Sequence, residues 1–215
     1  MKKIKLFALC LAASAFVFTG CDKDKGGDGG DNGITTITIN VENGADYEAD
    51  SVYMTAYKYD TLGYVADEVI LARAAYNGGK ISLSPTAPPA NLLDNVTNIN
   101  NKFDYLTISD ETVKMLSNFS FIVLKDGKKI GDLDFEDSPT NSSMEGWYTY
   151  ADKKVNITGE EVSEIWKEKI VFNVAFNQGW NVMRVVYRED NGYDVWDYTA
   201  NNVQGLKWFF DADAQ

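Results

Sequence analysis

Histidine is absent from the 215-residue sequence, and this absence removes several classes of chemistry at once. Without an imidazole there is no histidine base, no Ser-His or Cys-His nucleophile and no histidine-ligated metal. Acidic, lysine, tyrosine and serine side chains remain. They leave two kinds of reactive site open: a pair of carboxylates, as in glycoside hydrolases, and a calcium site built from oxygen ligands.

Cysteine is nearly absent as well, since only Cys10 and Cys21 occur. Both lie in a segment that has the order of a secretory signal peptide, with lysines within positions 2–5, an apolar run over 6–18 and small residues before Cys21. The apolar run is too short to cross a bilayer as a helix. We expect Cys10 to leave with the signal peptide and Cys21 to be acylated, so the remaining chain forms no disulfide and depends on its hydrophobic core.

The residues Phe18-Thr19-Gly20-Cys21 resemble the lipobox of bacterial lipoproteins. The resemblance implies that residues 1–20 are removed and that Cys21 receives the acyl chains, palmitate among them, that attach the protein to a membrane. Cys21-Asp22-Lys23-Asp24 also resembles the signal that sends lipoproteins of the Bacteroidota to the outer face of the outer membrane. It implies a cell-surface location, with a location facing the periplasm as the alternative. An ordinary signal peptide with a coincidental cysteine stays open as another interpretation.

Glycine and aspartate dominate the residues that follow Cys21, and this composition predicts a flexible tether. The predicted organisation is therefore a signal peptide over 1–20, an acylated cysteine and tether over 21–33, and one folded domain over 34–215.

Positive charge is scarce in the chain, which has 32 acidic and 20 basic residues and a net charge of −12. Removing Lys2, Lys3 and Lys5 with the signal peptide leaves 17 basic residues and takes the net charge to −15. Such a charge repels nucleic acid and anionic lipid headgroups. We expect no nucleic-acid partner and attachment to the membrane through the acyl chains alone.

Apolar and polar residues alternate along most of the domain, with the two-residue period of half-buried strands. Ile37, Ile39 and Val41, for example, share one face of a strand. Turn residues recur at the intervals typical of antiparallel sandwiches and barrels. We predict an all-β fold, an antiparallel β-sandwich of about ten strands, with a closed, lipocalin-like β-barrel as the alternative. The expected strands cover 34–41, 51–59, 64–76, 80–84, 119–125, 128–135, 146–150, 154–158, 170–176, 180–188, 193–198 and 206–210.

Turn residues also predict which strands pair. Asp126-Gly127 indicates a hairpin, because the pair supplies the positive φ of a tight turn. Asn177-Gln178-Gly179 predicts a second hairpin between the strands over 170–176 and 180–188. A single helical turn is expected to begin at Ser109, whose hydroxyl would cap it.

Five turn and strand motifs are spread over the domain: Thr38-Ile39-Asn40-Val41-Glu42-Asn43-Gly44, Tyr76-Asn77-Gly78-Gly79, Tyr150-Ala151-Asp152-Lys153-Lys154-Val155, Gly179-Trp180-Asn181-Val182 and Leu206-Lys207-Trp208-Phe209. They resemble motifs of a broad group of Bacteroidota lipoproteins of unassigned function. The resemblance covers most of the domain and implies a β-sandwich without any particular chemistry. Ser51 and Thr61 also lie in short sequences that resemble the O-glycosylation signal of that phylum, with ordinary turn or strand-edge hydroxyls as the alternative.

Acidic residues offer few candidates for catalysis or metal binding. Asp132, Asp134 and Glu136 share one face of a predicted strand, which indicates a solvated outer face, with a shared cation as the alternative. Asp194 and Asp197 lie on opposite faces of another strand and make a poor acid–base pair. We expect no metal and no cofactor.

Aromatic residues are the stronger candidates for a binding site. Trp196 and Tyr198 share a strand face beside Asn201 and Asn202, and flat rings with amides suit the apolar face and hydroxyls of a sugar. Core or rim packing of the same rings is the alternative.

The function expected from these features is that of a non-catalytic envelope lipoprotein that binds a glycan, a peptide or another envelope protein. A structural or adhesive component of the envelope is the first alternative, and it would associate through sheet edges. A glycoside hydrolase that uses two carboxylates is the second.

Overall fold

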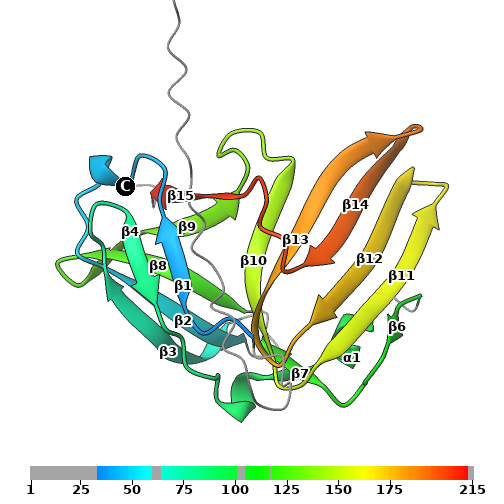
Figure 1. Ribbon diagram of the computed structural model, residues 1–215, viewed down its shortest axis with the longest axis horizontal. Helices are drawn as coiled ribbons and strands as arrows, with labels where there is room; N and C mark the ends of the chain where they lie inside the picture. The colour runs from blue at the N-terminus through cyan, green and yellow to red at the C-terminus, as the bar shows by residue number, and fades with distance from the viewer. Residues whose placement is uncertain (1–32, 60–63, 101–104, 117, 213–215) are drawn as a thin grey trace, which may run out of the picture. The chain divides into compact units, whose positions relative to one another are not determined.

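The computed structural model describes residues 33–59, 64–100, 105–116 and 118–212, and most of this part is β-strand (Figure 1). The residues predicted to form the signal peptide and the tether, with Cys21 between them, lie outside the described residues, and so does Thr61. No helix of the described part is long and apolar enough to cross a membrane. The strands are β1 (Ile37–Asn40), β2 (Ser51–Tyr59), β3 (Val65–Ala75), β4 (Lys80–Leu83), β5 (Asp94–Asn95), β6 (Thr107–Ile108), β7 (Lys114–Leu116), β8 (Phe119–Lys125), β9 (Lys128–Glu136), β10 (Met144–Ala151), β11 (Val155–Ser163), β12 (Glu168–Phe176), β13 (Gly179–Asp190), β14 (Tyr193–Ala200) and β15 (Lys207–Ala212).

Thirteen strands form one large sheet, and β1 and β4 form a separate two-stranded sheet. The main path of the large sheet runs β3-β2-β8-β9-β10-β13-β14-β12-β11-β6, while β15 pairs with β9 and β7 pairs with β10 and β5. The path does not close into a barrel. The all-β, sandwich-like fold is confirmed, and the closed-barrel alternative is wrong.

The large sheet is almost divided where β9 meets β10. Glu136 and Glu145 are the one residue pair in register across this boundary, whereas β10 pairs with β13 from Met144 to Ala151. β15 lies along β9 from Lys207 to Ala212. We call the boundary the seam; it joins one half, β3-β2-β8-β9-β15, to the other, β10-β13-β14-β12-β11 (Figure 1).

The two cores lie on opposite faces of the sheet, and β10 and β13 of the second half also contribute Tyr148, Trp180 and Val182 to the first core. Val52 and Met54 of β2 belong to the first core, which also contains the buried residues of β1 and β4. We call this face the front face. Val174 and Phe176 of β12 pack against Val113 in the second core, on the back face. The strand registers across the seam fix this assignment, because side chains alternate between the two faces of each strand.

One predicted hairpin is wrong, because β14 lies between β12 and β13. Asn191 and Gly192 connect β13 to β14 with φ angles of 54° and 79°, a two-residue turn that matches the twist of the paired strands. β14 therefore pairs with β13 and takes the place beside it that β12 was expected to fill. It also pairs with β12 in parallel, an exception to the otherwise antiparallel pairing of the described strands.

The helical turn expected at Ser109 is also wrong. Ser109 Oγ accepts a hydrogen bond from the backbone N–H of Asn156 at 2.9 Å, so its hydroxyl serves β11. Asp110 Oδ1 accepts from the backbone N–H and the hydroxyl of Thr112, at 2.9 and 2.7 Å, and closes a side-chain turn. A single helical turn lies instead at α1 (Thr97–Asn100).

The edge strand β3 is protected on its free side. Its register with β2 shifts at two places, between Met54 and Thr55 and between Lys58 and Tyr59. Thr86 donates its backbone N–H and its hydroxyl to the Leu71 carbonyl oxygen at 3.1 and 3.2 Å. Register shifts and an occupied carbonyl both hinder the addition of another strand.

Candidate functional site

A group of aromatic rings lies on the back face beside the seam. The registers place Glu136, Glu145, Val185, Tyr198 and Phe172 in one row across β9, β10, β13, β14 and β12. The rows on either side contain further aromatic residues. We call the following six residues the aromatic–acidic face: Trp147, Tyr187, Trp196, Tyr198, Glu136 and Glu145.

Tyr198 forms the base of this surface. Its ring stacks on Phe172 with the centroids 4.4 Å apart and an angle of 4° between the planes. Trp147 meets the same ring edge-on at 6.2 Å and 78°. Phe172 is buried in the second core, whereas Trp147 and Tyr198 are half-buried. Tyr198 is therefore fixed by packing, as a platform residue must be.

Trp196 extends the surface along β14, two residues from Tyr198 toward the turn between β13 and β14. It lies between Ile170 of β12 and Tyr187 of β13 in the strand registers, on the same face as Tyr198. Both Trp196 and Tyr187 are half-buried and line a cavity of about 290 Å³ with Arg188, Asp194 and Val195. The sequence prediction that Trp196 and Tyr198 share a face is confirmed.

Two cavities open at the seam and share Asp134 and Trp147. The first has a volume of about 380 Å³, and Asp132 and Asp211 add further carboxylates to its lining. The second has a volume of about 390 Å³ and contains Glu136 and Glu145. Aromatic side chains complete the first cavity: Phe119, Phe121, Phe135 and Trp208.

The carboxylates at the seam disfavour one another's ionised forms. Burial, and next the charge of Asp134, raises the pKa of Glu136 above its ordinary value, and Glu145 adds to the effect. Loss of water, and then the charges of Asp211, Asp132 and Glu145, raises the pKa of Asp134. The seam therefore presents concentrated negative charge beside aromatic rings.

Glu145 also connects the acidic part of the surface to the aromatic part. The Tyr187 hydroxyl donates a hydrogen bond to Glu145 Oε2 at 3.3 Å. Burial, together with the nearby Glu145 charge, raises the pKa of Tyr187 to about 12. The hydroxyl of Tyr187 is therefore protonated at neutral pH and remains a donor.

Asp132, Asp134 and Glu136 lie on the face opposite their buried neighbour Leu133, as their spacing predicts. This face is only partly solvated, because Asp132 and Glu136 are half-buried and burial raises the pKa of Asp134 and of Glu136. Asp132 is paired with Lys129 at 2.6 Å. Among the described residues, no group of three acidic or cysteine side chains could hold a metal ion. Asp194 and Asp197 lie on opposite faces of β14, as predicted from their spacing.

Asn201 and Asn202, the two asparagines expected beside the rings, form hydrogen bonds within the protein. Asn201 Oδ1 accepts from the backbone N–H of Val182 at 3.1 Å, and its amide donates to Asn181 Oδ1 at 3.2 Å. Asn202 Oδ1 accepts from the backbone N–H of Gln204 at 3.1 Å. The Asn201 side chain and the Asn202 oxygen therefore bond to the protein itself, so the prediction that these asparagines contact a ligand beside Trp196 finds no support in their contacts.

Sequence reasoning missed Trp147, Tyr187 and Glu145. The alternation in β10 separates Trp147 from Tyr148 and Tyr150, which belong to the first core or pack against it. That alternation was visible in the sequence. The register that brings β10 beside β13 and β14 was not, because it depends on the seam and on the placement of β14.

Of the two sequences that resemble a glycosylation signal, only the one at Ser51 lies among the described residues. Ser51 begins β2 and is in register with Ala75 and Leu124 on either side, so it lies inside the sheet and not at a strand edge. It is half-buried. Thr61 is outside the described residues.

No protein-family model, curated protein or solved structure matches this chain, so the geometry of the back face carries the functional argument.

Proposed function

We propose that this protein is an outer-membrane lipoprotein, anchored through acyl chains on Cys21 and displayed at the cell surface, whose domain binds a neutral glycan without cleaving it. The observation that carries the proposal is the aromatic–acidic face. Three strands supply its four rings, and two further strand positions supply carboxylates beside them. Flat rings can lie against the apolar face of a sugar, and carboxylates accept hydrogen bonds from its hydroxyls.

The charge of the surface selects among glycans. Asp134, Glu136 and Glu145 gather at the seam, in a chain that is acidic as a whole. Sulfated or uronate-rich polysaccharides would be repelled, as nucleic acids would be. A neutral polysaccharide meets no such penalty, so it is the ligand class that this surface favours.

A binding screen tests the proposal. The mature chain, residues 21–215 with Cys21→Ser, would be measured against soluble neutral glucans, mannans and xylans and against anionic pectin and alginate. We expect a neutral glycan to bind and the anionic ones not to bind. Trp196→Ala should weaken that binding by about 1–3 kcal/mol, the range for an aromatic anchor.

Val203→Ala is the matched control for the tryptophan variant, because Val203 is an exposed apolar residue in the loop between β14 and β15. It should leave the affinity unchanged. The proposal fails if every glycan is ignored, or if Trp196→Ala binds as tightly as the unchanged protein.

A carboxylate-dependent glycoside hydrolase is the second candidate, and one observation favours it. Glu136 and Glu145 come from different strands and stand directly opposite each other, with the pKa of Glu136 raised. Such a pair can divide the roles of acid and base. Turnover of a neutral glycan that disappears in both Glu136→Gln and Glu145→Gln would place this candidate first.

A structural or adhesive role has less support. It would rely on strand addition at the sheet edges, and β3 is protected by its register shifts and by Thr86. At the other edge, β6 covers only Ile157 and Thr158 of β11, and the rest of β11 carries Glu160 and Glu161, whose charges also oppose strand addition.

A further inference from the structure

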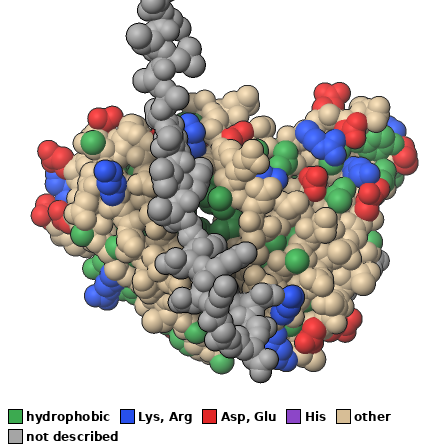
Figure 2. Space-filling model, viewed as in Figure 1, with side chains coloured by type: hydrophobic (Ala, Val, Ile, Leu, Met, Phe, Trp, Pro, Cys, Tyr) green, Lys and Arg blue, Asp and Glu red, His purple; other side chains and the backbone are tan. Residues whose placement is uncertain are grey.

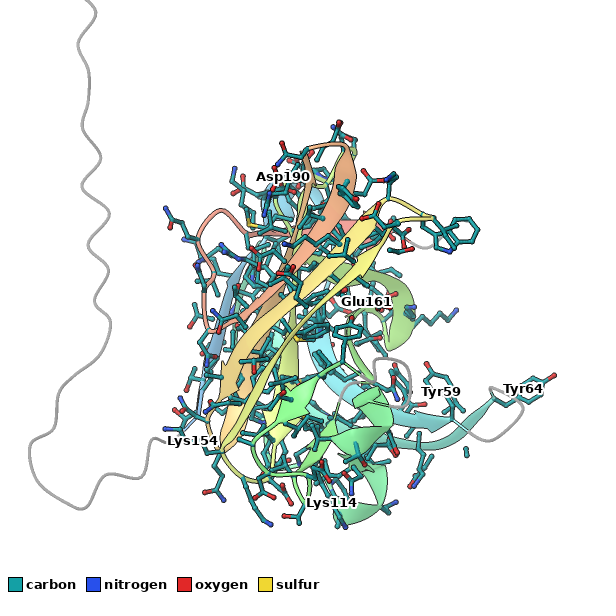
Figure 3. All side chains as sticks on the ribbon, turned by 90° about the vertical axis from the view of Figure 1, so that its right-hand side faces the viewer. Tyr59, Tyr64, Lys114, Lys154, Glu161 and Asp190 are labelled. Carbon is teal, nitrogen blue, oxygen red and sulfur yellow. The ribbon has the colours of Figure 1, made fainter. Side chains whose placement is uncertain are left out.

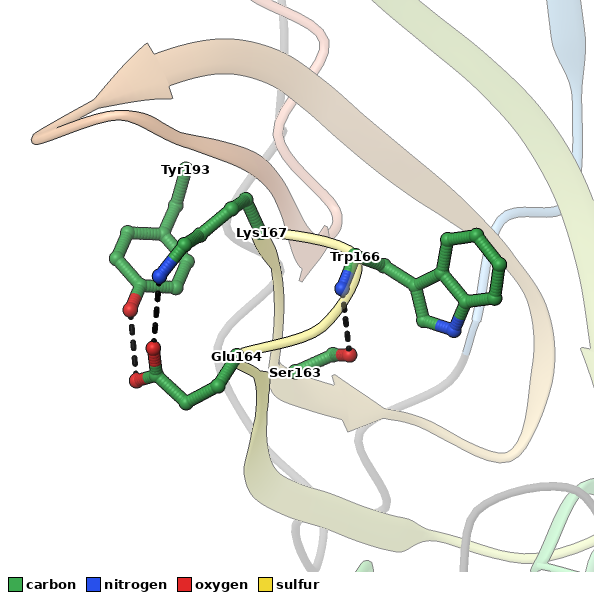
Figure 4. Close-up of polar contacts among 5 residues, drawn as sticks. All are labelled: Ser163, Glu164, Trp166, Lys167 and Tyr193. Carbon is green, nitrogen blue, oxygen red and sulfur yellow. Dashed lines mark hydrogen bonds and ion pairs between the residues drawn. The ribbon is translucent and has the colours of Figure 1, made fainter.

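The turn between β11 and β12 is built around a fixed network of polar contacts (Figure 4). The Lys167 ammonium lies 2.8 Å from Glu164 Oε2, and the Tyr193 hydroxyl donates to Glu164 Oε1 at 2.7 Å. Lys167 also lies over the Tyr193 ring at 5.0 Å. The backbone N–H of Trp166 donates to Ser163 Oγ at 3.2 Å. These contacts hold the turn in one shape although it stands in water.

The same turn exposes two large apolar side chains. Ile165 is 85% exposed and Trp166 is 74% exposed, the two highest values among the large hydrophobic residues that the structure describes. Burial is the usual state of a tryptophan, and a fixed turn that keeps one in water is typical of a contact surface. Two ion pairs lie near the turn: Glu160 with Lys169 at 2.9 Å and Arg188 with Asp190 at 3.1 Å. Figure 2 shows acidic and basic side chains mixed at the corresponding corner of the front.

Trp166 lies on the side of the back face. Tyr193 belongs to the front face, because it alternates with Asp194 and Trp196 along β14. Figure 4 shows Trp166 directed away from Tyr193, on the other side of the turn. In Figure 3 the β11–β12 turn, in yellow, extends to the same side as the labelled Tyr59 and Tyr64, away from the front of Figure 1.

The turn also continues the aromatic–acidic face. Trp147 and Trp196 are in register with Met183 and Tyr187 of β13, four residues apart, so about 13 Å separates them along the strand direction. Ile170, beside Trp196, precedes Phe172 on the back face of β12 and lies four positions from Trp166. The three tryptophans therefore follow one direction across the back face, from the seam to the tip of the turn.

We propose that Trp166 is a further contact for the ligand of the aromatic–acidic face, and that the ligand is an extended polysaccharide chain of several sugar units and not a single sugar or a chain end. This inference rests on the proposed function. A single sugar could cover one ring, whereas only a chain can reach all three tryptophans.

A membrane is a less suitable occupant for the tip. The backbone N–H groups of Gly33 and Ile34 donate to the carbonyl oxygens of Gln178 and Trp180, each at 2.7 Å, so the chain enters the domain at the start of β13. The β11–β12 turn lies near the far end of that 12-residue strand, about 40 Å away. The tip is thus remote from the place where the anchored segment joins.

The test compares oligosaccharides of two and of six units, prepared from whichever neutral polysaccharide the screen identifies. Calorimetric titrations would use the mature chain with Cys21→Ser, alone and with Trp166→Ala, Trp196→Ala or Val203→Ala. We expect Trp166→Ala to weaken the six-unit ligand at least fivefold and to leave the two-unit ligand unchanged. Trp196→Ala should weaken both, and Val203→Ala neither.

The outcomes separate the two proposals. If the six-unit ligand binds Trp166→Ala as tightly as the unchanged protein, the polysaccharide inference is wrong while glycan binding stands. If no glycan binds, or Trp196→Ala changes nothing, the proposed function is wrong and the inference falls with it. Because Trp166 is exposed, its replacement should leave the far-ultraviolet circular dichroism spectrum unchanged, which checks that the variant folds.

Discussion

At the scale of the residue, the same amide side chain can serve a ligand or the backbone, and only its neighbours decide. Asn181 is 1% exposed; it accepts from the backbone N–H of Asn177 and donates to the carbonyl oxygens of Asn177 and Gly179, all at 2.9 Å. Asn201, with a φ of 55°, hydrogen-bonds to Asn181 and to β13. These two asparagines join the loop between β12 and β13 to the segment that follows β14, and they give its buried polar groups hydrogen-bond partners.

The carboxylates at the seam allow a prediction at the same scale. The pKa of Glu136 is raised in the folded protein by burial, Asp134 and Glu145, so the folded state binds this proton more tightly than the unfolded state. Protonated Glu136 contributes stability at low pH. This contribution is lost as the pH rises from 4.5, the ordinary pKa of a glutamate, through the raised pKa of the folded state. Glu136→Gln should therefore increase the free energy of unfolding at pH 7 by about 0.2–1 kcal/mol, the range for cross-strand charge pairs.

Urea unfolding at pH 7 and at pH 4 measures this difference. The gain should shrink at pH 4, where Glu136 is largely protonated in both states. Glu111→Gln, at an exposed acid between β6 and β7, is the control and should change little at either pH. A gain that is larger at pH 4 would contradict the assignment of repulsion to Glu136.

At the scale of the element, the sequence predicts strands better than it predicts their neighbours. β2 begins and ends at the predicted residues, and the Asp126-Gly127 hairpin forms with φ angles of 51° and 73°. Both follow from local rules of alternation and turn geometry. Local rules do not predict the partner of β12, because β14, which comes later in the chain, takes the place beside β12 where β13 was expected.

The candidate site divides in the same way. Trp196 and Tyr198 were predictable because two residues on one strand share a face by period alone. Glu136 and Glu145 were not predictable as a pair, since only the register at the seam places them opposite each other. Tyr187 and Trp147 join them through three strands, and no local pattern in the sequence specifies that order.

The close approach of β9 and β15 leads to a prediction for these elements. Gly131 is buried in β9 opposite Ala212, and a Cβ atom there would overlap the carbonyl oxygen of Asp211 and touch the Phe210 ring. Gly131→Ala should force β15 away and lower the free energy of unfolding by about 1–3 kcal/mol, the usual cost of overpacking.

Denaturant unfolding would measure the loss, and Lys128→Ala, at an exposed position of the same strand, would serve as the control. We expect the control to stay within about 0.5 kcal/mol of the unchanged protein. Equal stability of the glycine variant and the control would argue against the tight pairing of β9 with β15.

At the scale of the whole molecule, a single sheet supports two cores by using both of its faces. The β1–β4 sheet belongs to the front core of one half, and residues of the segment from Val96 to Met115 belong to the back core of the other. The first half is covered on its front face, whereas the second half contributes to both cores, with Tyr148, Trp180 and Val182 in the front core. Near the seam, the back face stays open in the first half and over the part of the second half that carries Trp147, Tyr187 and Trp196. The candidate site lies there.

Membrane attachment is the prediction that concerns the complete chain. Cys21→Ser should release the protein from the membrane fraction, because the acidic domain offers no electrostatic attraction to anionic lipids that could replace the acyl chains. Partitioning into detergent after expression in a bacterium with lipoprotein processing would measure it. Cys10→Ser, within the predicted signal peptide, is the matched control and should remain anchored. Unchanged partitioning of Cys21→Ser would refute the lipobox interpretation.

The position of the last two strands has a consequence for how the chain reaches this structure. β14 inserts between β12 and β13, and β15 completes the pairing of β9 in the other half. Neither half can close its hydrogen-bonded network until residues near the C-terminus have left the ribosome. Both halves can therefore complete their folding only late in synthesis. A nascent chain that stops before Tyr193 would leave unpaired strand edges exposed to other chains.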